Sequence, residues 1–205
     1  METGVTLIYD GSFKGFLCAV YQAYERNLRV TDIVKAENYQ KDMFSKSLKI
    51  TTDVNRAKRV WFKLRDKYYD TLKNLYFAFL SETAGIEIRL YHEIVNRIGR
   101  LPLSKELNNK NGMGYLEDIV EHVSQEKRKW EASINLDFPQ GKPPVVKISP
   151  RYNIIPLISR YFRLTYTRTP WVIYDQCRNY GIYFDGVSTQ LISEIPEHFK
   201  WAVAA

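Results

Sequence analysis

Three aspartates stand at the ends of stretches that we expect to be strands: Asp10, Asp175 and Asp185. If those strands are neighbours in one sheet, two or three carboxylates converge at its edge. Such a group binds a metal ion or serves as a general acid and base. Aspartate is also frequent in turns, because its carboxylate accepts hydrogen bonds from nearby backbone amides. The three residues are therefore candidates for catalysis, with a structural turn role as the alternative.

Other catalytic signatures are missing from the sequence. Cys18 and Cys177 are far apart and have no metal-ligand or redox spacing. The three histidines, His92, His122 and His198, each lack a second ligand at metal-binding spacing. Neither a glycine-rich phosphate loop nor a nucleophile elbow is present. We therefore expect no metal and no cofactor, and whether the protein is an enzyme stays open.

The strongest chemical signal is a basic and aromatic stretch between residues 142 and 178, in which the only acid is Asp175. Lys and Arg neutralise phosphates, and aromatic faces stack on unpaired bases. We expect Phe162 and Trp171 to lie in the core and the cations to form a binding face. The cations are Lys142, Lys147, Arg151, Arg160, Arg163, Arg168 and Arg178, and the interleaved aromatic residues are Tyr152, Tyr161, Phe162, Tyr166 and Trp171.

A second group of cations lies on a helix that we expect to begin after Asp53. Arg56, Arg59, Lys63 and Lys67 are spaced three, four and four residues apart. Residues at this spacing share one helix face, so the four form a basic stripe.

Composition favours an anionic partner. The 205 residues include 30 Lys and Arg against 23 Asp and Glu, which gives a net charge of +7 and a pI near 9.3. A nucleic acid is the first candidate for such a partner. The N-terminal residues lack the basic and apolar regions of a signal peptide, and no apolar run is long enough to span a membrane. We expect a cytoplasmic protein without membrane association.

The elements that must position these residues can be inferred from periodicity and turn signals. The apolar residues before Asp10 predict a first strand near residues 5–9, and Gly11 with Ser12 predicts a turn and a helix N-cap. Helical spacing continues to about residue 26. Further helices are expected from Asp53, from Asp70, over 86–98 and to about residue 130, with a short strand over 47–51 and a loop or linker over 99–114.

The C-terminal part is predicted to be mostly strands. Residues 133–138 and 145–148 form an expected hairpin, and 154–162 a short helix with Pro156 in its first turn. Strands over 171–174 and 181–184 precede a turn at Asp185-Gly186 and a last strand near 189–193. This order predicts one α+β domain over 1–205, in which a helical part (about 12–131) packs with a mostly antiparallel sheet (about 132–195).

Several strings, taken in order, resemble one bacterial family that has no established activity and is linked to DNA metabolism and DNA repair. The resemblance runs from about residue 5 to 194. The middle of the family is matched by Arg59-Val60-Trp61 and Leu75-Tyr76-Phe77-Ala78-Phe79-Leu80-Ser81-Glu82. The end strings are Tyr9-Asp10-Gly11-Ser12-Phe13, Arg151-Tyr152-Asn153-Ile154-Ile155-Pro156-Leu157, Phe162, Pro170-Trp171-Val172-Ile173-Tyr174-Asp175, Arg178, Gly181 and Tyr183-Phe184-Asp185-Gly186.

The resemblance implies a partner rather than a reaction. Family members accompany a radical-SAM protein of DNA modification or repair, or precede a uracil-DNA glycosylase-like domain. This chain has no radical-SAM cysteine triad and is too short to include a fused glycosylase, so the resemblance implies the stand-alone companion form.

One segment departs from the family pattern. Where the family has Glu, His and Arg leading to a Gly and an Arg-Phe pair, this chain reads Glu126-Lys127-Arg128-Lys129-Trp130-Glu131-Ala132, then Leu136-Asp137-Phe138. The histidine near Arg128 is absent and Ala132 stands at the glycine position. If that histidine is catalytic, this chain is impaired or different. If the segment only touches DNA, Lys127, Arg128 and Lys129 can serve instead.

Three hypotheses follow. The first is a DNA-binding accessory protein that presents single-stranded or damaged DNA to a radical-SAM or glycosylase-like partner, with Tyr152, Tyr161 or Tyr166 stacking on a base. The second is a nucleic-acid-processing enzyme centred on Asp10, Asp175 and Asp185, and the third is a protein-interaction subunit without DNA binding. The expected DNA-binding residues are Arg56, Arg59, Lys63, Arg151, Tyr152, Arg160, Arg163 and Arg168.

Overall fold

The computed structural model describes residues 4–41, 46–98, 111–136, 143–197 and 199, without the side chains of 66–69, 98 and 111–113. The chain forms two compact units, residues 1–120 and 121–205, and each is described by itself. Several expectations lie outside these residues: the side chains of Lys67 and Lys142, residues 137–138, His198 and most of the 99–114 loop. The expectation of a single domain over 1–205 stays a prediction.

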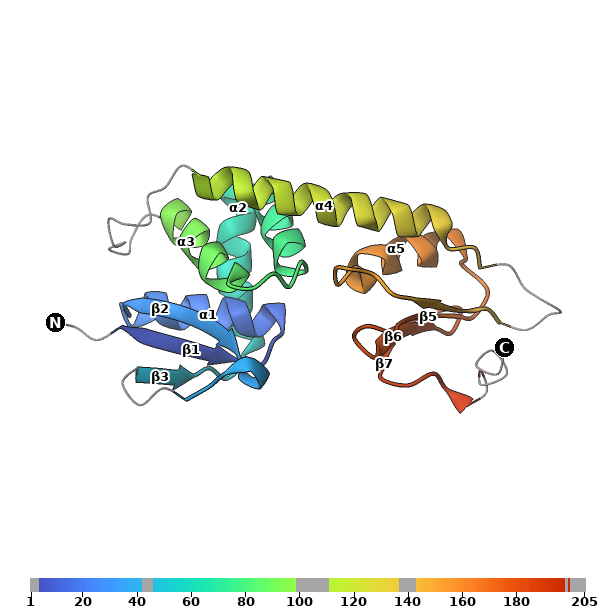
Figure 1. Cartoon of the computed structure of the whole chain (residues 1–205), viewed down its shortest axis with the longest axis horizontal. Coiled ribbons are helices and arrows are strands. Elements are labelled where there is room, and N and C mark those ends of the chain that lie inside the picture. The colour runs from blue at the N-terminus through green and yellow to red at the C-terminus, as the bar shows by residue number, and fades with distance from the viewer. Residues whose placement is uncertain (1–3, 42–45, 99–110, 137–142, 198, 200–205) are drawn as a thin grey trace. The chain divides into compact units, whose positions relative to one another are not determined.

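The first unit contains a three-stranded parallel sheet. Strand β1 (Val5–Tyr9) lies between β2 (Val30–Lys35) and β3 (Lys46–Lys49), and both neighbours run parallel to it (Figure 1). The sequence predicted β1 and the position of β3 closely, but β2 was missed and the parallel pairing was not expected. Because β1 is central, its carboxyl end meets the carboxyl ends of both neighbours at one edge of the sheet.

Helix α1 (Phe13–Glu25) begins where the turn after β1 ends. Gly11 has φ +83°, a conformation that side chains disfavour, and the Ser12 hydroxyl accepts a hydrogen bond from the Gly15 amide. Both features confirm the predicted turn and N-cap. The helix buries Phe16, Leu17 and Val20.

Helix α2 (Val54–Phe79) follows β3, and α3 (Ile86–Ile98) follows α2. The Asp53 carboxylate accepts from the amides of Asn55 and Arg56, which confirms the predicted cap. The prediction that a new helix begins at Asp70 was wrong, because α2 is 26 residues long and continues through Asp70. A short 3-10 turn (Ala36–Asn38) and helix α4 (Asn111–Ser133) complete the helices before the second sheet.

The second unit contains a four-stranded sheet in the order β4-β5-β6-β7. Strands β5 (Trp171–Asp175), β6 (Tyr180–Phe184) and β7 (Thr189–Ile192) are antiparallel, as predicted. Strand β4 (Val145–Ile148) is instead parallel to β5 and is connected to it through α5 (Ile155–Thr165). The predicted hairpin was therefore wrong: Ser133 ends α4, and residues 134–136 form no strand.

Helix α5 lies against this sheet (Figure 1), and aromatic residues make the contact. Phe162, Trp171 and Phe184 are almost fully buried. The centre of the Trp171 ring lies 6.2 Å from the centre of the Phe162 ring and 5.3 Å from that of Phe184. The core role predicted for Phe162 and Trp171 is thus confirmed. The mixed α and β class is also confirmed, with a four-stranded and mostly antiparallel C-terminal sheet. No helix in the described ranges is long and apolar enough to cross a membrane.

Candidate nucleic-acid interface

Asp10 joins the starts of the first two helices. One carboxylate oxygen accepts from the Ser12 amide (3.0 Å) and the Ser12 hydroxyl (2.7 Å), and the other accepts from the Thr52 hydroxyl (2.6 Å). Partial burial raises the pKa of Asp10, but the hydrogen bonds from Thr52 and Ser12 outweigh it and hold the pKa below its ordinary value. The sequence did not identify Thr52 as a hydrogen-bond partner of Asp10, although Thr52 directly precedes the predicted cap Asp53.

Asp175 is a buried structural residue. Its carboxylate, which is 0 % exposed, lies 3.0 Å from the Arg178 guanidinium and accepts from the amides of Cys177 and Arg178. The same guanidinium donates to the carbonyls of Pro150 and Arg151. Asp175 and Arg178 therefore hold the β5–β6 turn against the segment that leads into α5, and neither faces an open site.

Asp185 is exposed and closes the turn between β6 and β7. Its carboxylate accepts from the amides of Ser188 and Val187 and from the Ser188 hydroxyl, and the two amide bonds are the main reason that the pKa of Asp185 is lowered. This is the turn role that was the alternative to catalysis.

The structure does not bring Asp175 and Asp185 together. Asp175 pairs with Tyr180 at one end of the β5–β6 ladder, and Asp185 follows Phe184 at the other end. Five residue steps of an antiparallel strand separate them by about 17 Å. Asp10 follows a strand of a different sheet. Strands β5 and β6 are neighbours, but because they are antiparallel their carboxyl ends lie at opposite ends of the ladder, so the shared site does not form there. No three His, Cys, Asp or Glu side chains form a possible metal site among the described residues.

The basic stripe of α2 packs on two tyrosines of α1. The guanidinium groups of Arg56 and Arg59 each lie 5.9 Å from the centre of the Tyr21 ring, and Arg59 also donates to the Tyr21 hydroxyl (3.0 Å). The Lys63 ammonium lies 5.2 Å from the Tyr24 ring. These contacts orient the cations, which we call the α2 basic face (Arg56, Arg59 and Lys63). Tyr21 and Tyr24 are three residues apart on a helix, and this spacing could have identified them in the sequence as rings on one helix face.

The exposed surface of α5 carries cations without acidic partners. Arg160 and Arg163 are exposed on the helix and Arg168 in the loop after it, and none of them has a hydrogen bond or ion pair with a described residue. Tyr161 is 44 % exposed and Leu164 is 63 % exposed. We call Arg160, Tyr161, Arg163 and Leu164 the α5 face.

Arg151 and Tyr152 were both expected to bind DNA, but only Arg151 is exposed. Arg151 is exposed and its guanidinium lies 5.2 Å from the Tyr152 ring, but Tyr152 is only 9 % exposed. A ring that is this deeply buried offers no face to a base, so Tyr152 packs inside the unit while Arg151 keeps its charge at the surface.

The cations of segment 126–132, where the resemblance implied a histidine, are mostly paired with glutamates. Lys127 pairs with Glu131 at 2.6 Å, and Arg128 pairs with Glu121 at 2.9 Å. Glu126 accepts from the Arg151 amide and the Trp130 indole. Lys127 and Arg128 therefore already have carboxylate partners, unlike Arg160 and Arg163.

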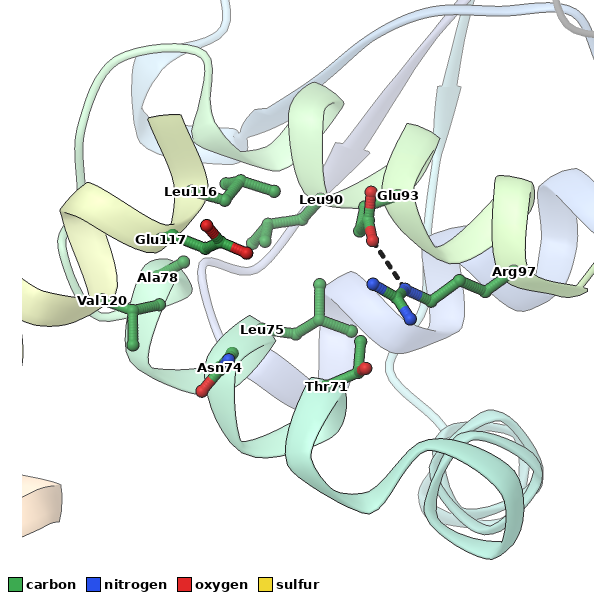
Figure 2. A pocket seen from close by; sticks show the side chains of 10 residues that line it. All are labelled: Thr71, Asn74, Leu75, Ala78, Leu90, Glu93, Arg97, Leu116, Glu117 and Val120. Atoms are coloured by element: carbon green, nitrogen blue, oxygen red, sulfur yellow. Dashed lines mark hydrogen bonds and ion pairs between the residues drawn. The ribbon is translucent and has the colours of Figure 1, made fainter. Parts of the chain in front are cut away.

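A pocket of about 60 Å³ lies among α2, α3 and α4 in the first unit. Leu75, Leu90 and Leu116 extend into it, and the Glu93–Arg97 ion pair lies at its side (Figure 2). Small-molecule sites usually need roughly 300 Å³ or more, so this pocket is too small for a cofactor.

Comparison with known proteins gives a family without a function. Residues 84–201 match the model of a domain of unknown function, DUF4130. No curated protein matches the chain, and no solved structure matches it. The matched residues include helix α5 and every strand of the second sheet. The chain belongs to the DUF4130 family.

Proposed function

We propose that this protein binds single-stranded or damaged DNA as an accessory protein of DNA metabolism or repair. The single observation that carries the proposal is the α5 face, where arginines without acidic partners lie beside exposed apolar side chains. Arginine binds phosphate oxygens through its planar fork of donors, and each phosphate that it neutralises releases counterions from DNA.

The contrast with α4 supports this assignment. On α4, Lys127 and Arg128 each lie within 3 Å of a glutamate, as cations of an ordinary solvated helix surface often do. Helix α5 contains no acid at all. A cation without an acidic neighbour keeps its full attraction for phosphate, since no carboxylate competes for its hydrogen bonds.

The α2 basic face supports DNA binding from the first unit. Arg59 and Lys63 are exposed, and Arg56 is half-buried. The net charge of +7 attracts a polyanion at longer range.

A protein partner is also part of this proposal, because the sequence resembles a family whose members accompany one. We propose that this cytoplasmic protein acts with a radical-SAM protein or a uracil-DNA glycosylase-like protein. Co-purification of either partner with the tagged protein tests this part. A tagged protein that captures neither in cells that produce both contradicts it.

Equilibrium binding tests the DNA-binding proposal. Fluorescence anisotropy is measured with a labelled oligonucleotide as a single strand, as a duplex and as RNA of the same sequence. Arg160→Glu combined with Arg163→Glu is expected to weaken DNA binding about tenfold or more at low salt. The control is Lys58→Glu combined with Lys73→Glu, which changes the net charge equally at exposed positions outside both faces.

The outcomes separate the hypotheses. Equal losses in both double variants indicate an effect of net charge alone and contradict a binding role of α5. Tighter binding to RNA than to DNA contradicts the assignment to DNA. No binding to any of these nucleic acids at low salt overturns the proposal in favour of a protein-interaction subunit.

A further inference from the structure

Exposed aromatic rings differ in whether a cation covers them. Phe62, Tyr115 and Tyr161 are the large aromatic side chains with 37 % or more of their surface exposed among the described residues. The Arg65 guanidinium lies 4.7 Å from the Phe62 ring, and the Arg89 guanidinium lies 4.5 Å from the Tyr115 ring. No described cation lies over Tyr161, so its ring is the one with an open face.

The aromatic residues beside the other cations are not open. The rings of Tyr21 and Tyr24 lie against the α2 basic face, and Tyr152 is buried against Arg151. Tyr166 is half-buried and stacks on Phe162, with 19° between the ring planes. These rings already have partners, so an incoming base would have to displace protein contacts to use them.

The position of Tyr161 also suits a base that is attached to a phosphate chain. At 3.6 residues per turn, the order around α5 is Arg163, Arg160, Leu164 and Tyr161. The two cations therefore lie on one side of the face, and the two apolar side chains lie on the other. Side chains three or four positions apart have Cβ atoms about 5–6 Å apart. A nucleotide can thus place its phosphate at the arginines and its base against Tyr161 and Leu164.

The ring itself is held in place from below. Phe162, which is fully buried, contacts Tyr161 edge to face with 5.0 Å between ring centres and 88° between planes. A ring held this way loses little further freedom when a base stacks on it.

We propose that Tyr161 is the residue by which the α5 face distinguishes unpaired bases from base pairs, an inference that rests on the DNA binding proposed above. A base within a duplex is stacked between its neighbours and presents no face to a side chain. An unpaired base presents one. The arginines contact phosphates in either form, so Tyr161 contributes to single-strand binding alone, and the α2 basic face contributes charge without strand preference.

The test compares the affinities of one protein for two DNA forms. The probes are a labelled oligothymidylate of about 15 nucleotides and a duplex of equal length, in the same buffer. Tyr161→Ala is expected to weaken single-strand binding about fivefold or more and to leave duplex binding unchanged. Tyr161→Phe keeps the ring and is expected to stay within about twofold of the wild type for both probes.

Tyr115→Ala is the matched control, because it removes an exposed tyrosine whose ring a cation already covers. It is expected to leave the ratio of the two affinities unchanged, and circular dichroism verifies that each variant is folded. A Tyr161→Ala protein that keeps the wild-type ratio overturns this inference. If Tyr161→Ala keeps the wild-type ratio but the Arg160→Glu, Arg163→Glu protein has lost DNA binding, the proposed DNA binding stands and only the inference about Tyr161 fails. A wild-type protein that binds neither probe overturns both.

Discussion

The Asp10 carboxylate occupies the space that a side chain on Gly15 would need. A Cβ added to Gly15 would lie 2.1 Å from Asp10 Oδ1 and 2.9 Å from the Thr52 hydroxyl oxygen. Helix α1 can therefore begin beneath Asp10 only because residue 15 has no side chain. This relationship gives a physical reason for a glycine in the first turn of a helix, where alanine would otherwise be preferred.

Gly15→Ala is expected to destabilise the protein by about 1–3 kcal/mol, because Asp10 must leave its hydrogen bonds to Ser12 and Thr52. In an Asp10→Ala background the same substitution is expected to destabilise much less, since the contact at 2.1 Å is gone, only the Thr52 hydroxyl oxygen at 2.9 Å remains close, and alanine favours the helix. Urea unfolding of the four proteins gives both values. Equal effects of Gly15→Ala in the two backgrounds contradict the contact.

The hydrogen bonds of Asp10 are expected to appear in the pH dependence of stability. A folded-state pKa below the ordinary value of 3.8 means that the ionised carboxylate stabilises the fold. That stabilisation is complete above the unfolded-state pKa and is lost as the pH falls through the folded-state pKa. The difference in unfolding free energy between wild type and Asp10→Ala should therefore shrink as the pH falls below about 4. A difference that is constant from neutral to acidic pH would refute this.

Asp175→Asn tests whether Asp175 is structural. Removing the charge leaves the Arg178 guanidinium partly buried without its ion-pair partner, and a loss of about 3 kcal/mol is expected. Asp185→Asn is the control, because Asp185 is exposed in its turn and its loss should cost much less stability than the loss of Asp175. The measurement is denaturant unfolding of both variants. An Asp175→Asn protein as stable as the wild type would show that the pair does not hold the β5–β6 turn.

The α2 basic face is expected to set the salt dependence of binding. Each of Arg56→Gln, Arg59→Gln and Lys63→Gln should reduce the slope of log affinity against log salt by roughly 0.7 for single-stranded DNA. The ratio of single-strand to duplex affinity should not change, because the tyrosines beneath these cations are covered. Anisotropy titrations at several salt concentrations provide both quantities. An unchanged slope in all three variants would remove this face from the interface.

Gly181→Ala tests a second close approach, in the second sheet. A Cβ at Gly181 would lie 2.4 Å from the backbone oxygen of Ile173 and 2.9 Å from Tyr174 Cα, on the strand that pairs with it. Backbone atoms of a central strand cannot move aside as a side chain can, so a loss of about 2 kcal/mol or more is expected. Thermal unfolding measures it, and Gly114→Ala, where a Cβ meets nothing within 4 Å, is the control.

Local chemistry was enough to predict many elements from the sequence. The caps at Ser12 and Asp53, the helix with Pro156 in its first turn and the turn at Asp185-Gly186 each depend on residues within a few positions of one another. Such contacts form wherever the local backbone allows them, so they can be recognised in the sequence. The cations of α2 were identified by their spacing on a helix, and those of α5 by a basic and aromatic stretch with a single acid. Their role in DNA binding stays a prediction.

Tertiary structure alone decided which of these residues face solvent and which strands pair. Strand β2 and the parallel pairing of β4 with β5 depend on partners distant in the chain, which hydrophobic periodicity does not specify. Burial likewise separated Tyr152 from Tyr161, although both are tyrosines beside arginines in the sequence. The sequence by itself determined the charge, the helix faces and the turns of this protein. The packing of distant segments decided that Asp10, Asp175 and Asp185 each serve their own turn. Asp10 follows a strand of the first sheet, and the antiparallel pairing of β5 with β6 places Asp175 and Asp185 at opposite ends of their ladder.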